Sequence, residues 1–124
     1  MRSPIVNQIN TIFVHVSDLK RSVQWYSELL GHEYDLETVS DPVYNIEIIH
    51  FTGLTLDAGP ERVTKRKVAS GYPLFNFHTE DITAAFSFCE KMGYEIDSEI
   101  ANFEDFSFFT IKDPDGNVIM ICTG

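Results

Sequence analysis

The chain has 124 residues, enough for one domain with a sizeable core, and its 19 acidic and 9 basic residues give a net charge of −10. Because an acidic surface repels phosphate groups, this charge argues against nucleic acid and anionic membranes as partners. The composition is that of a globular protein, and no apolar run approaches the length of a membrane span.

The ends of the chain and its cysteines suggest a cytoplasmic protein. The N-terminal sequence MRSPIVNQIN lacks the apolar core of a signal peptide. Cys89 and Cys122 are too few for a disulfide framework and have no CxxC spacing, so we interpret both as buried thiols. Four of the basic residues lie in the stretch 61–67, ERVTKRK, which we interpret as a solvated linker rather than a binding patch.

A pattern is repeated within the chain. Its first copy is TIFVHVSDLKRSVQWYSELLGHEYD and its second is LFNFHTEDITAAFSFCEKMGYEID. His15 corresponds to His78, an offset of 63 residues. A repeat of this size indicates duplication of a supersecondary module. We therefore predict a single domain over 1–124 that consists of a first module (about 9–58), a linker (about 59–72) and a second module (about 73–123).

Each module is predicted to begin with a strand and continue into a helix. Apolar residues alternate with others in both first strands. Asp18 and Asp81 are good N-cap residues, and Gly31 and Gly93 stand where a left-handed residue ends a helix. Three strand candidates follow each helix, over about 32–38, 44–51 and 54–58 in the first module and about 94–100, 106–112 and 117–123 in the second.

The order βαβββ in each module predicts an α+β fold with two four-stranded sheets, each carrying a helix on one face. The other face of each sheet, here called the open face, must then cover another sheet or enclose a ligand. Ile119 and Ile121 are expected on the helix side. The open faces are expected to carry Thr11, Phe13 and His15 on the first strand and Val118, Met120 and Cys122 on the last.

Three segments carry a resemblance to a known family. VSDLKRSVQWYSELLG, TEDITAAFSFCEKMG and FTIKDPDGNVIMI resemble parts of the vicinal oxygen chelate superfamily, and the resemblance extends over residues 9–123. Its members include glyoxalase I, extradiol dioxygenases, fosfomycin-resistance enzymes and bleomycin-binding proteins. The resemblance implies a concave-sheet fold. It also implies a homodimer, with modules paired within or across subunits and ligand sites in the resulting cups.

The resemblance also locates the metal-ligand positions of the family's metal-dependent members. The histidine of the first strand falls at Thr11, its counterpart in the second module at Leu74, and the glutamate after DPDGNVI at Met120. On the fourth strand the match is Thr55, with Asp57 as the alternative on the same face. Leucine has no donor atom and a thioether is a poor ligand for hard ions, so we expect no metal or other cofactor.

Further side chains are candidates for the pocket. His15 and His78 are either acid–base or hydrogen-bonding groups, or histidines at the sheet edge bonded to backbone or water. Glu47 points either inward, where it would hold a cationic ligand, or outward into solvent. The phenylalanines of the region 103–109 are expected to pack mostly in the core, with one or two at a pocket wall. The pocket candidates are Thr11, Phe13, His15, Glu47, Thr55, Asp57, Leu74, Asn76, His78, Phe108, Met120 and Cys122.

Two functional hypotheses follow. The first is a binding protein that sequesters a small apolar or cationic compound without a metal, in the manner of bleomycin-resistance proteins. The second is a glyoxalase-like lyase or isomerase, or a dioxygenase-related enzyme, that uses a non-standard metal or acid–base site built from Asp57, His15 and His78. The sequence contains no GxSxG, HExxH or phosphate-loop motif. We favour the first hypothesis; the sequence does not identify the ligand.

Overall fold

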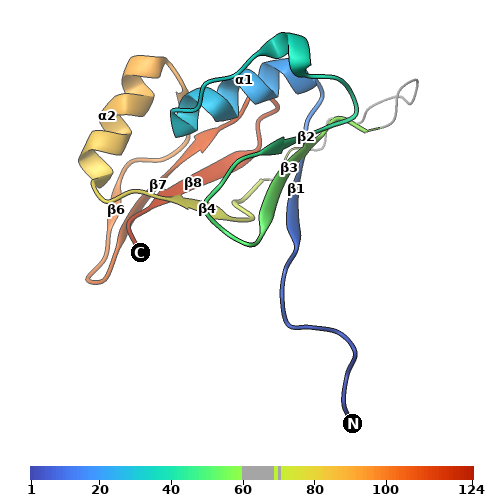
Figure 1. Ribbon diagram of the computed structural model, residues 1–124. Helices are drawn as coiled ribbons and strands as arrows, with labels where there is room; N and C mark the ends of the chain where they lie inside the picture. The colour runs from blue at the N-terminus through green and yellow to red at the C-terminus, as the bar shows by residue number, and fades with distance from the viewer. Residues whose placement is uncertain (60–68, 70) are drawn as a thin grey trace. The chain divides into compact units, whose positions relative to one another are not determined.

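The computed structural model describes residues 1–59, 69 and 71–124. The chain divides into two compact units, Met1–Lys65 and Arg66–Gly124, and the described residues of each contain one α-helix and one sheet (Figure 1). The α+β class predicted from the sequence is confirmed. The basic stretch 61–67 lies outside the described residues, so its role as a linker stays a prediction. Within the described part of the chain, no helix has the length and apolar character needed to cross a membrane.

The first unit contains a three-stranded sheet in the order β1-β3-β2. β1 (Thr11–His15) is parallel to β3 (Gly53–Asp57), and β2 (Val43–Ile46) is antiparallel to β3. The helix α1 (Leu19–Leu30) packs against β2 and β3 and buries Val23 completely.

The second unit contains five strands in the order β4-β8-β7-β5, with β6 also paired to β7. β4 (Asn76–His78) is parallel to β8 (Val118–Cys122), which is antiparallel to β7 (Ser107–Lys112). The helix α2 (Ile82–Met92) packs against β7 and β8. The Phe86 ring of α2 meets the fully buried Phe109 ring edge-on, with centroids 5.1 Å apart, so this is the helix side of the sheet.

The helix ends are those that the sequence predicts. The carboxylates of Asp18 and Asp81 each accept a hydrogen bond from a backbone N–H three residues further on. Gly31 and Gly93 adopt the left-handed conformation, with φ of 71° and 75°. Other residues are strained in this conformation, so glycine is the residue best suited to end a helix in this way.

The strand predicted over 32–38 is wrong. The segment contains a short 3₁₀ helix, η1 (Leu36–Thr38), in its place. The Asp35 carboxylate accepts a hydrogen bond from the Glu37 N–H at 3.0 Å, and the Asp35 carbonyl accepts one from Thr38 Oγ1 at 2.7 Å. Local bonds between side chains and backbone of this kind compete with sheet pairing.

The strand predicted over 44–51 is correct only in its first part, because β2 ends at Ile46. Ile46 lies opposite Leu54, and the residues after it form the connection from β2 back to β3. Ile49 and Phe51 in this connection are each 97% exposed. Their alternation in the sequence therefore does not mark a buried face.

The strand predicted over 94–100 is interrupted. Its first part is β5 (Glu95–Ile96), and β6 (Ala101–Asn102) is a separate strand. The N–H groups of Asp97 and Ser98 both donate to the carbonyl of Thr110, at 2.8 and 3.3 Å. Two residues opposite one is the arrangement of a β-bulge, which breaks the ladder at this point.

The turn between β7 and β8 is organised by Asp113, whose side chain is buried. Its carboxylate accepts hydrogen bonds from the N–H groups of Asp115 and Asn117, at 2.9 and 2.8 Å, and from Asn117 Nδ2 at 2.9 Å. Gly116 completes the turn with φ of 84°. The segment DPDGN is therefore a structural element that sets where β8 begins.

Candidate functional site

The open face of the first sheet follows the alternation predicted for β1. Val14 and Val16 are each 6% exposed, whereas Phe13 and His15 are exposed. Thr11 is half-buried and lies opposite Gly53. The side chains of Phe13 and His15 therefore lie on the face away from the core.

The centre of this open face is a row of three residues from neighbouring strands. Thr55 of β3 lies opposite Phe13 on one side and Asn45 on the other. Thr55 is buried, and its hydroxyl donates a 2.7 Å hydrogen bond to Asn45 Oδ1. The next row places His15 opposite Asp57, whose carboxylate accepts a 2.8 Å hydrogen bond from the Gly59 N–H.

The second sheet has an equivalent row. Met120 of β8 lies opposite Asn76 of β4 and Thr110 of β7. The Asn76 amide Nδ2 is 3.8 Å from the Met120 sulfur, a distance typical of a weak hydrogen bond to a thioether. Met120 is half-buried and Thr110 is buried. This row contains an amide, a thioether and a hydroxyl, and no ionisable group.

The two rows show which residue of the first sheet corresponds to Met120. The 63-residue offset of the repeat relates Phe13 to Asn76. Phe13 pairs with Thr55, and Asn76 pairs with Met120. Thr55 is thus the structural counterpart of Met120.

The residues at the four positions that the family resemblance assigns to metal ligands do not fit a divalent metal. Thr11 and Thr55 offer neutral hydroxyls, the Thr55 hydroxyl is already hydrogen-bonded, and Met120 offers only a thioether. Leu74 precedes β4 and is 68% exposed. In residues 1–59, 69 and 71–124, no three His, Cys, Asp or Glu side chains are grouped so that they could hold a metal ion.

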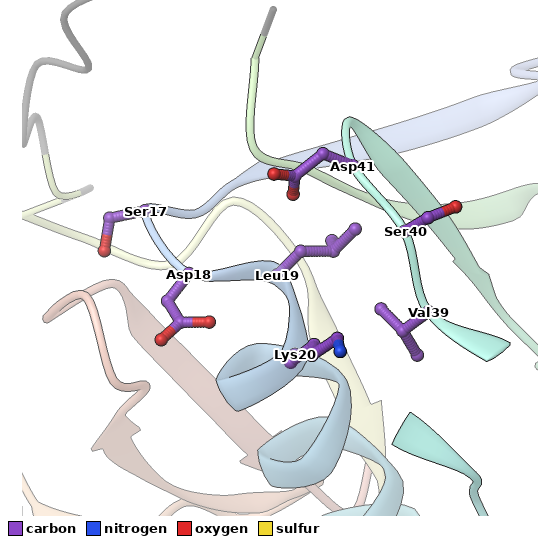
Figure 2. Close-up of a pocket in the computed structure, with 7 residues that line it drawn as sticks. All are labelled: Ser17, Asp18, Leu19, Lys20, Val39, Ser40 and Asp41. Carbon is purple, nitrogen blue, oxygen red and sulfur yellow. The ribbon is translucent and has the colours of Figure 1, made fainter. Parts of the chain in front are cut away.

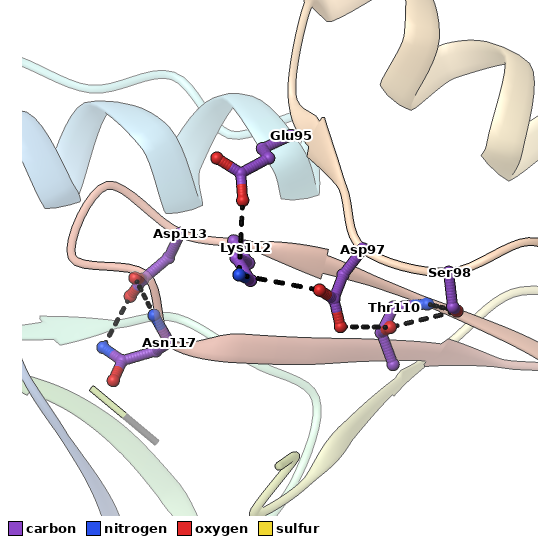
Figure 3. Close-up of polar contacts among 7 residues, drawn as sticks. All are labelled: Glu95, Asp97, Ser98, Thr110, Lys112, Asp113 and Asn117. Carbon is purple, nitrogen blue, oxygen red and sulfur yellow. Dashed lines mark hydrogen bonds and ion pairs between the residues drawn. The ribbon is translucent and has the colours of Figure 1, made fainter. Parts of the chain in front are cut away.

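A polar network adjoins the row of the second sheet (Figure 3). The Thr110 hydroxyl is 3.2 Å from Asp97 Oδ2 and 3.0 Å from the Ser98 hydroxyl. Lys112 Nζ lies 3.7 Å from the other Asp97 oxygen and 3.6 Å from Glu95. Lys112 and Thr110 are two residues apart on β7, so the network extends along the same face as Met120.

Phe108 lies on this face as well, opposite Cys122 and two residues from Thr110. Cys122 is buried, and its sulfur accepts a 3.3 Å hydrogen bond from the Gly124 N–H. His78 is exposed and lies 3.8 Å from Glu80. Of the four phenylalanines in this region only Phe109 is in the core, so the prediction that most of them pack there is wrong.

Glu47 is not on either row. It follows β2, is exposed, and its backbone carbonyl is 2.7 Å from His32 Nε2. It lines a pocket of about 450 Å³ at the end of α1, together with Ser27, Gly31, His32, Glu33, Tyr44, Asn45 and Ile46. The inward position considered for Glu47 is therefore not adopted, because β2 ends one residue earlier.

A second pocket of about 360 Å³ lies at the start of α1 (Figure 2). It is formed by residues 17–20 and 39–41, none of which the sequence indicated as a site residue. The Asp18 carboxylate at its edge is engaged as the helix N-cap. We therefore assign this pocket to the packing of the helix start rather than to ligand binding.

Sequence reasoning missed Asn45 and Thr110, the partners of Thr55 and Met120. Both were within predicted strands, and Thr110 is two residues from Phe108, which was a candidate. The alternation that selected Phe108 therefore also selects Thr110. Asn45 corresponds to Thr110 only through the strand pairing, which the sequence repeat does not reach.

The chain is similar to a known protein family over most of its length. The model of the Glyoxalase/Bleomycin resistance protein/Dioxygenase superfamily matches residues 8–121. No curated protein matches the sequence.

Among solved structures, similar chains cover nearly the whole length. A lactoylglutathione lyase from Agrobacterium tumefaciens is 18% identical with a TM-score of 0.69, over 98% of this chain and 96% of that chain. A glyoxalase/bleomycin resistance protein from Catenulispora acidiphila is 22% identical with a TM-score of 0.64, over 94% and 99%. A putative glyoxalase from Bacillus halodurans is 15% identical with a TM-score of 0.71, over 95% and 96%. At these identities the likeness concerns the fold alone.

Proposed function

Because this chain belongs to the Glyoxalase/Bleomycin resistance protein/Dioxygenase superfamily, we propose that its open sheet faces bind a small organic molecule without a metal ion. The observation that carries the proposal is the pair of central residues, Thr55 and Met120. Neither supplies a charged donor, and a thioether at the centre of a face favours apolar contact with a ligand over ion coordination.

The chemistry of the rows supports a ligand that is largely apolar with a few polar groups. Asn76 and Asn45 offer amides beside Met120 and Thr55, and Phe13 is 53% exposed on the first open face. Binding sites for small molecules combine apolar walls with few, well-placed polar groups in this way. The net charge of −10 favours a cationic compound over an anionic one.

The proposal extends to the assembly and the compartment. We propose a homodimer, because open faces that carry exposed apolar residues such as Phe13 and Val43 are covered more favourably by another module than by water. We propose a cytoplasmic location, with a small molecule as the partner and no nucleic acid or membrane.

A thermal-shift screen tests the proposed function. Protein treated with EDTA is heated with a panel of small compounds, chosen to include neutral, cationic and anionic members. We expect a subset of apolar or cationic compounds to raise Tm in the presence of EDTA, because a ligand that binds only the folded state stabilises it. Compounds that raise Tm only after a divalent metal is restored would contradict the proposal.

A second candidate function is an enzyme that relies on an acid–base pair. It is favoured by one observation, namely that His15 and Asp57 lie opposite each other on the open face. Proton transfer requires an acid–base pair on one face, and the register places an imidazole and a carboxylate on the same face. Stoichiometric zinc, nickel, iron or manganese in protein purified without chelator would favour this candidate. His15→Gln would then abolish turnover while leaving ligand binding largely intact.

A further inference from the structure

The hairpin between β6 and β7 carries three stacked phenylalanine rings. Phe103 and Phe106 have centroids 5.0 Å apart, and Phe108 lies 5.9 Å from the first and 6.1 Å from the second. The ring planes of Phe103 and Phe108 differ by 4°. Phe103 is 57% exposed and Phe106 38%, so the stack is a surface feature that continues the open face of Phe108.

The stack is held in place by its backbone. The Phe103 N–H donates to the Phe106 carbonyl at 2.8 Å, which closes the hairpin. At its base, the Ser107 N–H donates to Thr123 Oγ1 at 2.9 Å, and the Thr123 N–H donates back to the Ser107 carbonyl at 3.0 Å. A ligand that stacks here would meet rings already arranged, which reduces the entropy lost on binding.

The electrostatic surroundings are negative. Glu95 and Asp97 are paired with Lys112, but residues 99–111 contain three further acidic residues and no lysine or arginine. Glu104 and Asp105 lie in the turn between the two exposed rings, and both are exposed. Phenyl faces and carboxylates attract the same kind of group, a cation, and stacking requires that this cation be flat.

We propose that this aromatic hairpin, defined by Phe103, Glu104, Asp105, Phe106 and Phe108, binds a flat aromatic cation. The ring system of the cation stacks on Phe103 and Phe106, and Glu104 and Asp105 neutralise its charge. This inference rests on the proposed function, since Phe108 shares its face with Met120, and it gives the class of the ligand. Neutral aromatic compounds lose the charge contribution, and anions are repelled.

Ethidium is a suitable probe, because it is a flat aromatic cation whose fluorescence changes on leaving water. The full chain is titrated with ethidium in EDTA-containing buffer at low and at high salt. We expect saturable binding that weakens as salt is raised, since screening reduces attraction between exposed charges. Phenanthridine, the related uncharged ring system, is expected to bind more weakly than ethidium by about tenfold or more.

Variants locate the site. Phe103→Leu removes one stacking face, and Glu104→Gln with Asp105→Asn removes the two charges. Each is expected to weaken ethidium binding by about threefold to tenfold, in line with the size of exposed cation–π and ionic contacts. Phe88→Leu and Glu90→Gln, at an exposed aromatic and an exposed acidic residue of α2, are the matched controls and are expected to change it less than about twofold.

The outcomes are distinct. Absence of ethidium binding, equal binding of phenanthridine, or binding that Phe103→Leu and the charge variant leave unchanged would each overturn the aromatic hairpin as the site. In those cases the proposed function is decided separately by the thermal-shift screen in EDTA. Ethidium binding that appears only after a divalent metal is added would overturn the proposed function instead.

Discussion

Thr55 of β3 and Met120 of β8 occupy the same place in their respective sheets. Each lies between the first strand of its unit and an antiparallel neighbour, with Phe13 and Asn45 beside the first and Asn76 and Thr110 beside the second. Neither residue can provide a charged ligand. The two equivalent positions therefore have the same limitation toward metals, although they hold different amino acids.

Met120 can be tested by two substitutions of similar size. Met120→Leu is expected to cost less than about 1.5 kcal/mol of unfolding free energy, because it preserves volume at a site without charged neighbours in its row. Met120→Glu is expected to cost about 1 to 3 kcal/mol, since it places a carboxylate on a half-buried site beside a neutral amide and hydroxyl. Urea denaturation of the three proteins measures both values. Equal stability of the Leu and Glu variants would mean that the position is effectively solvated.

Asp113 should be far more important for stability than its place in a turn suggests. Asp113→Ala removes the carboxylate that accepts three hydrogen bonds, two of them from the buried Asn117. We expect a loss of about 2 to 4 kcal/mol in urea denaturation. Asp105→Ala, at an exposed aspartate of the turn between β6 and β7, is the control and is expected to change stability by less than about 0.5 kcal/mol. A loss for Asp113→Ala as small as that of the control would contradict the structural role of the turn.

The thiol of Cys89 predicts a dependence of stability on alkaline pH. Burial raises the pKa of Cys89 from 9.0 to about 11. The unfolded chain releases this proton at lower pH than the folded chain, so the stabilisation is complete below about pH 9 and is lost as the pH rises toward about 11. Unfolding free energies of the wild type and Cys89→Ala at about pH 8 and about pH 10.5 isolate the effect, because other groups titrate alike in both proteins. The gap between the two proteins should narrow as pH rises; a gap that stays constant would exclude the raised pKa.

The proposed homodimer is tested by light scattering. One chain has a mass of 14.1 kDa, and we expect twice that mass at micromolar concentration. A dimer would cover the apolar side chains on the open faces, which a monomer would leave exposed to water. A mass of one chain across the accessible concentration range would contradict it.

The sequence predicted best those features that depend on short-range patterns. The helices end where Asp18, Gly31, Asp81 and Gly93 indicate, because caps act through the backbone of the neighbouring turn. The burial of Val14 and the exposure of Phe13 follow from strand alternation, which is also a short-range pattern because successive side chains point to opposite faces.

The incorrect strand predictions arise where local hydrogen bonds compete with sheet pairing, which the alternation of apolar residues does not reveal. Residues 32–38 alternate adequately for a strand, but the hydrogen bonds of Asp35 favour the 3₁₀ turn. In 94–100, the shared acceptor Thr110 breaks the strand. Of the candidate site, Thr55 and Met120 were identified through the family resemblance, whereas the hydrogen bond of Thr55 to Asn45 required the register of β2 against β3.

The measurement that tests the central proposal most directly is the metal content of wild-type protein purified without chelator, combined with its Tm before and after EDTA. We predict much less than one equivalent of any divalent transition metal, and a Tm that EDTA leaves unchanged. The reason is that Thr11, Thr55, Leu74 and Met120 offer no charged donor. One equivalent of metal per chain, with a Tm that falls on chelation and recovers when the metal is returned, would contradict the proposal of metal-free binding.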